Sequence, residues 1–192
     1  MRVFVAIDLG TTQGADPPPA PDHLTLRFVG EVDEAAADSL ARALAPAVAS
    51  LPAFELTLEG VGAFPGPRAP RVVWVGVTRG HDATLRLAAA VSEALVLVGF
   101  PRPDGTFVPH VTLWRVRSPA DRERARRLLD GREPAPAARA VRVDEVVLKE
   151  SVLAPTGAVH RTRARFPLAR TPGTIDSPAP ESARSVTSFR QR

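Results

Sequence analysis

The sequence predicts a core of mixed α and β structure, of the α/β or α+β class, and three observations support this. Short runs rich in Val, Ile and Phe are interleaved with longer runs whose apolar residues recur at helical spacing. A hydrophobic fraction of 44% over 192 residues can build the core of one domain or of two small lobes. No apolar run approaches the roughly 18 residues that a membrane-spanning helix needs.

In the first half of the chain, four strands and two helices are expected. Asp33 can cap the first helix, in which Leu40, Leu44 and Val48 recur every four residues, and Gly99 ends the second helix. Between the first two strands, the connector Gly10–Asp22 contains four prolines, which exclude a regular helix. The expected strands are Arg2–Leu9, His23–Val32, Phe54–Val61 and Val72–Thr78, and the expected helices are Asp33–Ser50 and Asp82–Val98.

The second half of the chain is expected to end in a pair of strands followed by a disordered tail. The sequence predicts a loop at Phe100–Pro109, a strand at His110–Arg117, a helix at Pro119–Asp130, and strands at Ala140–Leu153 and Ala158–Leu168. Beyond them the chain is rich in Ser, Thr, Pro and Ala without apolar periodicity. We therefore expect one folded domain over residues 1–169 and a disordered tail over residues 170–192.

The composition excludes several classes of function. The absence of Cys excludes disulfides, thiolate catalysis, iron–sulfur clusters and cysteine-based zinc sites. The four His lack short ligand spacing and no acidic cluster accompanies them, so no bound metal or cofactor is expected. The N-terminus enters a strand directly, without the pattern of a signal peptide, so a cytoplasmic protein with no membrane association is expected.

The pI of about 11.0 does not by itself indicate a nucleic-acid partner, because the formal charge is only +4. The 25 basic residues include a single Lys, Lys149, so the other 24 are Arg, and there is no Tyr. Almost nothing therefore titrates between neutral pH and the Arg range, and a small positive excess survives to high pH.

A repeated His-x-Thr pattern is the main functional signal. Two strands carry it with matched apolar flanks: His23-Leu24-Thr25-Leu26-Arg27-Phe28-Val29 and His110-Val111-Thr112-Leu113-Trp114-Arg115-Val116. On a strand, each His and its Thr share one face, so two such strands would line a cleft with two imidazoles and two hydroxyls. A neutral His can take a proton from water, a protonated His can give one to a leaving oxygen, and Thr hydroxyls can hold phosphate. A third copy, His160-Arg161-Thr162, has Arg in place of the apolar residue, and His160 faces the cleft or simply sits on the last strand.

These blocks, in this order, resemble the bacterial and archaeal RNA 2′,3′-cyclic phosphodiesterases of the 2H phosphoesterase superfamily, also called 2′-5′ RNA ligases. The resemblance covers most of residues 1–169. Besides the two His-x-Thr strands, it includes the opening Met1–Leu9, Gly62–Pro65, Pro70–Trp74, Phe107–Leu113, and Glu150–Leu153 with Phe166–Leu168. The resemblance implies a bilobal α+β fold in which two antiparallel sheets with outer helices flank a central cleft.

The resemblance also implies an activity and a set of site residues. The expected reaction is metal-independent opening of a 2′,3′-cyclic phosphate on RNA or a nucleoside to a 2′-phosphate. His110 would act as general base and His23 as general acid, Thr25 and Thr112 would hold the phosphate, and Arg115 would lie near it. Phe28 would stack on the base. Strict alternation places Phe28 and Arg115 on the faces opposite the two His, so a β-bulge or strand end is needed to turn them.

Other interpretations stay open within this class and outside it. The natural reaction could instead be ligation of 2′-5′ RNA ends, or the substrate could be another cyclic phosphodiester. As an alternative of a different class, the protein would bind RNA ends without cleaving them. The run Ile7–Thr12 resembles a phosphate loop of actin-like and Hsp70-like ATPases, but that fold needs two larger domains than this length allows. A basic helical face at Arg122, Arg124, Arg126 and Arg127 is better explained as a solvated surface. A monomer is expected.

Overall fold

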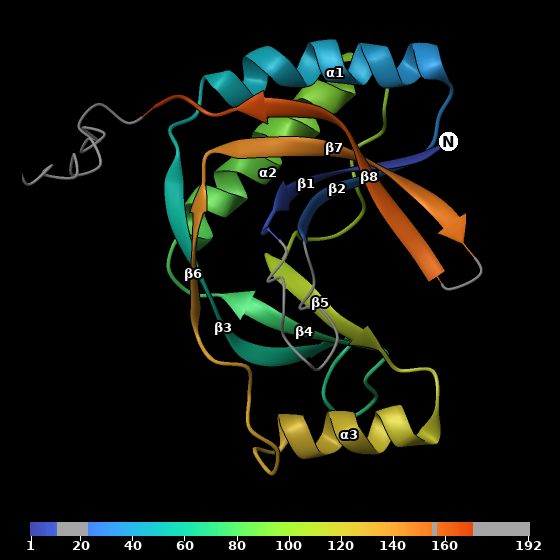
Figure 1. Cartoon of the computed structure of the whole chain (residues 1–192), viewed down its shortest axis with the longest axis vertical. Helices are drawn as coiled ribbons and strands as arrows, with labels where there is room; N and C mark the ends of the chain where they lie inside the picture. Colours follow the sequence, from blue (N-terminus) through green and yellow to red (C-terminus); the bar gives the residue numbers. More distant parts are fainter. Residues whose placement is uncertain (11–22, 155–156, 171–192) are drawn as a thin grey trace, which may run out of the picture.

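The computed structural model describes residues 1–10, 23–154 and 157–170, which form two sheets and three helices (Figure 1). The strands are β1 (Arg2–Asp8), β2 (His23–Glu31), β3 (Phe54–Phe64), β4 (Val72–Val77), β5 (His110–Arg115), β6 (Arg139–Val143), β7 (Glu145–Ala154) and β8 (Gly157–Pro167). The helices are α1 (Glu34–Ala49), α2 (His81–Leu97) and α3 (Pro119–Leu129).

Both sheets are antiparallel and have four strands. The first sheet has the order β2-β1-β7-β8 and the second has the order β5-β4-β3-β6. The strands β2 and β5 are therefore edge strands, and they lie in contact with each other where the two sheets meet (Figure 1). This arrangement confirms the predicted α+β class with two antiparallel sheets and outer helices.

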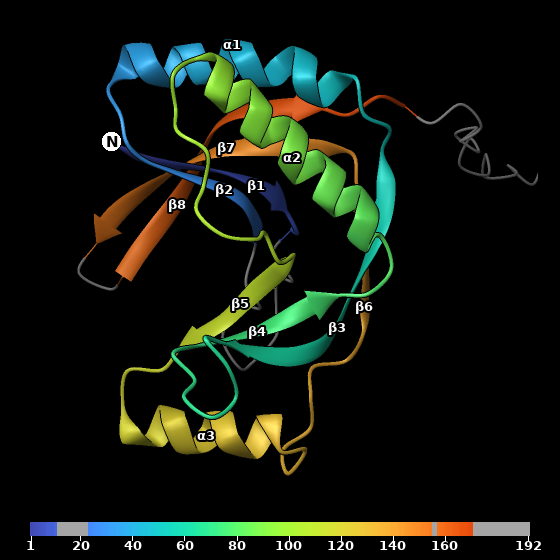
Figure 2. The ribbon, with the colours of Figure 1, turned by 180° about the vertical axis from the view of Figure 1, so that it is seen from behind.

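One continuous core joins both sheets to the helices α1 and α2. In β1, Val3, Val5 and Ile7 alternate onto this side and pack with Leu40 and Leu44 of α1. Seen from behind, α2 crosses the first sheet and reaches toward the second (Figure 2). The third helix covers the outer face of the second sheet, where Ala125 and Leu128 pack on Val73 of β4. Helices thus cover one face of each sheet, and the other face, which carries Phe4 and Ala6 in the first sheet, is called the cleft face below.

Most of the predicted elements are confirmed to within one or two residues. The Asp33 carboxylate caps α1 by accepting a 2.8 Å hydrogen bond from the Ala36 N–H, as the sequence predicted. Strand β3 runs beyond the predicted Val61 to Phe64, because its last residues pair with β4, ending at Phe64 opposite Val72. The Pro-rich connector and the tail predicted for residues 170–192 lie outside the described residues, apart from Gly10 and Arg170.

The prediction of a single strand over Ala140–Leu153 is wrong. The structure divides this segment at Asp144 into β6, which pairs with β3 in the second sheet, and β7, which pairs with β1 in the first. At the break, the Asp144 carbonyl accepts a 2.8 Å hydrogen bond from the Leu168 N–H. One predicted strand therefore serves two sheets, and it connects the second sheet to the first.

Candidate active site

The two His-x-Thr strands meet as the edge strands of the two sheets. In β2, His23 pairs with Asp8 and Thr25 pairs with Ala6 of β1, on the face opposite the buried Leu24. In β5, His110 pairs with Gly76 and Thr112 pairs with Trp74 of β4, on the face opposite the buried Val111. Both imidazoles and both hydroxyls are thus on the cleft side of their own sheets.

A β-bulge turns Phe28 onto the same face as His23. The β1–β2 register passes from Ala6 opposite Thr25 to Val5 opposite Arg27, so that one extra residue, Leu26, stands in β2. Both Leu26 and Arg27 are buried, and the next residue, Phe28, is 68% exposed. The rings of Phe28 and His23 both contact the Phe4 ring, at centroid distances of 6.0 and 4.9 Å.

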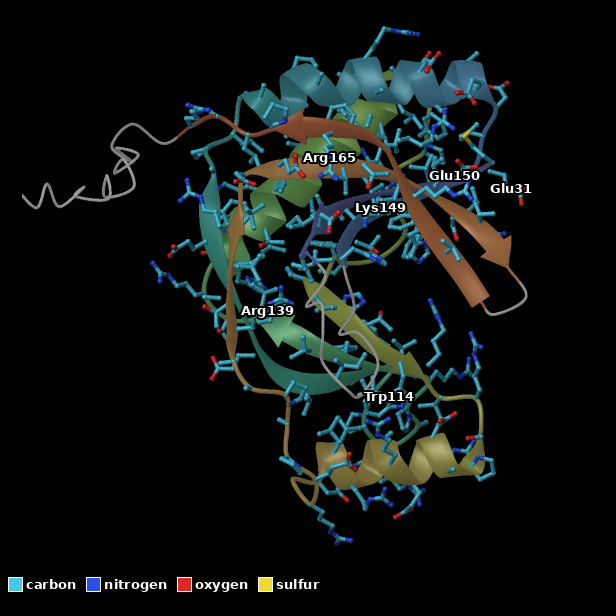
Figure 3. All side chains as sticks on the ribbon, viewed as in Figure 1. Glu31, Trp114, Arg139, Lys149, Glu150 and Arg165 are labelled. Atoms are coloured by element: carbon cyan, nitrogen blue, oxygen red, sulfur yellow. The ribbon has the colours of Figure 1, made fainter. Side chains whose placement is uncertain are left out.

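A second bulge does the same for Arg115 in β5. The register shifts between Thr112 opposite Trp74 and Trp114 opposite Val73, which leaves Leu113 as the extra residue. Trp114 packs away from the cleft, between β5 and α3, where the Arg124 guanidinium lies 4.4 Å from its ring centroid (Figure 3). Arg115 then lies opposite Val72, on the Thr112 face, with an exposed side chain.

Thr25, Phe28 and His110 line one cavity of about 710 Å³. The remaining walls come from Leu26 and Arg27 of β2, from Phe64 of β3, from α2 and from the segment between α2 and β5. Among the described residues, His23, Thr112 and Arg115 do not contribute to these walls. The cavity therefore brings together one Thr and one His from different sheets, together with the exposed aromatic ring.

Arg27, which follows the bulged Leu26 and lines this cavity, has a structural role. Its guanidinium donates to the Pro101 carbonyl and, at 3.5 Å, to the Ser92 hydroxyl, which ties β2 to α2 and to the segment that follows it. Burial lowers the pKa of the Arg27 guanidinium from its ordinary value. This contact fixes the wall of the cavity beside Phe28.

The His110 ring is oriented by a hydrogen bond and by aromatic neighbours. Its Nδ1 lies 2.8 Å from the Val108 carbonyl oxygen, and its ring centroid lies 4.9 Å from that of Phe64 and 6.0 Å from that of Trp74. A carbonyl only accepts, so Nδ1 carries the proton, and the neutral ring presents an unprotonated Nε2. Gly62 permits this packing, because a Cβ there would lie 2.3 Å from the Trp74 ring.

The His23 ring is surrounded by a different set of groups. Besides Phe4, it contacts the His160 ring at a centroid distance of 5.1 Å. Its register partner Asp8 forms an ion pair with Lys149 of β7, with Nζ and Oδ2 3.3 Å apart (Figure 3). Only 4% of Lys149 is exposed, so its ammonium group is buried beside Asp8, on the same face of the sheet as His23 and Phe4.

Phe4, Asp8 and Lys149 were not predicted from the sequence as components of the site. The apolar run Arg2–Leu9 predicts only a buried strand, whereas in the structure Phe4, Ala6 and Asp8 alternate onto the cleft face. The charged Asp8 at the end of this run was the available signal. Within the described ranges, no group of three or more His, Asp or Glu side chains is placed to hold a metal ion, and no helix is long and apolar enough to cross a membrane.

An α+β fold with two antiparallel sheets and a His-x-Thr motif on one edge strand of each is the arrangement expected of a 2H phosphoesterase. Residues 14–152 match the family model of the 2′-5′ RNA ligase superfamily, and the chain belongs to this superfamily. It is 38% identical over 140 residues to an RNA 2′,3′-cyclic phosphodiesterase of Aeropyrum pernix, covering 73% of this chain and 78% of the relative. A protein of the same name from Methanothermobacter thermautotrophicus is 31% identical over 185 residues, which is 88% of this chain and 99% of the relative.

Solved structures agree with the fold. The chain is similar to E. coli LigT, solved in complex with 3′-AMP, with a TM-score of 0.65 and 26% identity over 88% of this chain and 98% of that one. A protein of Thermus thermophilus gives a TM-score of 0.65 and 25% identity over 87% of this chain and 97% of the other. The resemblance inferred from the sequence is therefore confirmed at the level of family and fold.

Proposed function

We propose that this protein hydrolyses the 2′,3′-cyclic phosphate of an RNA end or nucleoside to a 2′-phosphate, without a metal ion. The observation that carries the proposal is the meeting of the two His-x-Thr edge strands, with both His and both Thr on the cleft side. The two relatives described above bear the name of this activity, and LigT has been solved with a 3′-nucleotide.

His110 is the proposed general base. The hydrogen bond between its Nδ1 and the Val108 carbonyl favours the tautomer in which Nε2 can accept a proton. Nε2 takes a proton from water as the water oxygen bonds to phosphorus. No metal is needed in this step, because the imidazole itself supplies the base.

His23 is the proposed general acid. As the new P–O bond forms, the bond between phosphorus and the 3′ oxygen breaks, and a protonated His23 gives its proton to that oxygen. The products are a 2′-phosphate and a 3′-hydroxyl. His110 then holds a proton and His23 lacks one, and exchange with solvent restores both.

The remaining residues bind the substrate in this proposal. The Thr25 and Thr112 hydroxyls donate hydrogen bonds to the non-bridging phosphate oxygens, on which negative charge develops in the transition state. Arg115 carries an exposed guanidinium on the Thr112 face and adds positive charge for the phosphate. Phe28 offers an exposed ring beside the cavity, on which a nucleobase can stack.

Hydrolysis of 2′,3′-cyclic mononucleotides and oligonucleotides in EDTA, with the product identified by phosphorus NMR, tests the proposal. The expected product is the 2′-phosphate, and His23→Ala and His110→Ala should each lower kcat by about 10³-fold. His81→Ala is the matched control, since His81 starts α2 and pairs with Asp82 outside the cavity. Wild-type activity in either cleft variant would contradict the proposed mechanism. Binding without hydrolysis would favour the RNA-end-binding alternative.

A further inference from the structure

The third His-x-Thr copy lies in the same sheet as His23. In β8, His160 pairs with Ser151 and Thr162 pairs with Lys149 of β7. Lys149 itself reaches Asp8, the register partner of His23. The copy therefore lies across the sheet from the first His-x-Thr strand.

The ring contacts place His160 on the cleft face. Its ring centroid lies 5.1 Å from that of His23 with an interplanar angle of 84°, and 5.0 Å from that of Phe4 at 82°. Phe4 is 3% exposed and also touches His23 at 4.9 Å. Three rings from β1, β2 and β8 thus form one cluster, in which His160 meets His23 edge to face.

This copy is not equipped as another phosphate site. A register shift in β8 between the partners of Leu148 and Lys149 places Arg165 opposite Val147, at the position that Arg115 holds in its own copy. Arg165, however, is already in an ion pair with Glu145 (Figure 3). What His160 adds to the cleft is its ring.

We propose that His160 is a positioning residue for His23, whose ring it holds in the orientation needed to protonate the leaving oxygen. This inference rests on the proposed function. The cluster has charged neighbours in Asp8 of β1 and Lys149 of β7, which are paired with each other. The support that His160 gives comes from the packing of its ring against the His23 ring, so an uncharged ring can replace it.

Three substitutions at this position separate ring packing from hydrogen bonding. His160→Ala should lower kcat by about 10- to 100-fold with little change in KM, because a misplaced acid slows the chemical step and leaves binding intact. His160→Phe should recover activity to within about threefold of wild type, whereas His160→Gln should resemble the Ala variant. Recovery by Gln with failure of Phe would overturn the proposal.

An NMR measurement gives a readout independent of turnover. The chain has four His, so single substitutions can assign each imidazole Cε1–H signal. In His160→Ala the His23 signal should move, because a ring at 5.1 Å shifts nearby protons, while the His81 signal stays in place. An unmoved His23 signal would overturn the proposal, as would a moved signal with wild-type kcat. Wild-type protein inactive on every cyclic phosphate would instead overturn the proposed function.

Discussion

The β2 and β5 strands carry the same sequence pattern but support their His in different ways. His110 is oriented by the carbonyl of Val108, two residues earlier, together with the rings of Phe64 and Trp74 from β3 and β4. His23 is oriented by rings from two other strands, those of Phe4 and His160. The position five residues after each His also differs, being an exposed Phe in β2 and an exposed Arg in β5. In the proposed mechanism, β5 provides the base and a cation for the phosphate, and β2 provides the acid and a surface for the nucleobase.

Removal of the Arg115 charge should have the largest effect among the proposed substrate-binding residues. Arg115→Ala should lower kcat/KM by about 10²-fold, since one donor to the charge developing in the transition state is lost. Steady-state kinetics on a 2′,3′-cyclic mononucleotide measure it. Arg126→Ala, in α3 on the outer side of the second sheet, is the matched control and should be unchanged. An equal loss of kcat/KM in both variants would show that the net positive charge of the protein matters, and not the position of Arg115 beyond the bulge.

Loss of the Phe28 ring should have a smaller effect and depend on the substrate. Phe28→Ala should raise KM for a cyclic nucleotide by roughly tenfold, because one base–aromatic stack is removed. A ribose 2′,3′-cyclic phosphate without a base should be hydrolysed equally by wild type and variant. Because Phe28 is 68% exposed, the free energy of unfolding should change little. A similar loss on both substrates would contradict a stacking role.

The smallest expected effect tests the support of His110. Gly62→Ala would place a Cβ 2.3 Å from the Trp74 ring, so the ring must move, and with it a neighbour of His110. The free energy of unfolding should fall by about 1–3 kcal/mol in urea, and kcat by a few fold. Gly66→Ala is the control, since a Cβ there meets nothing within 4 Å. Unchanged kcat in a destabilised Gly62 variant would show that Trp74 does not help to orient His110.

The helices, most strands and the paired His-x-Thr motif could be predicted from the sequence, because each depends on local periodicity and spacing. The sheet that each strand joins could not be predicted, and so the change of sheet at Asp144 was missed. From the sequence, a β-bulge or strand end is needed to turn Phe28 and Arg115 onto the faces of the two His. The positions of the bulges, at Leu26 and Leu113, could not be predicted, because they depend on pairing with neighbouring strands. For the same reason, the sequence does not predict whether His160 contacts His23. The two residues are distant in sequence, and only the pairing of strands brings them together.

The division of labour between the two His is tested most directly by the pH dependence of kcat/KM in wild type and in His110→Gln and His23→Gln. A base acts when neutral and an acid when protonated, so wild-type activity should rise and then fall as pH increases. The residual activity of His110→Gln should lose the rise, and that of His23→Gln should lose the fall. The same limb lost in both variants, or a wild-type profile without two limbs, would contradict the assignment.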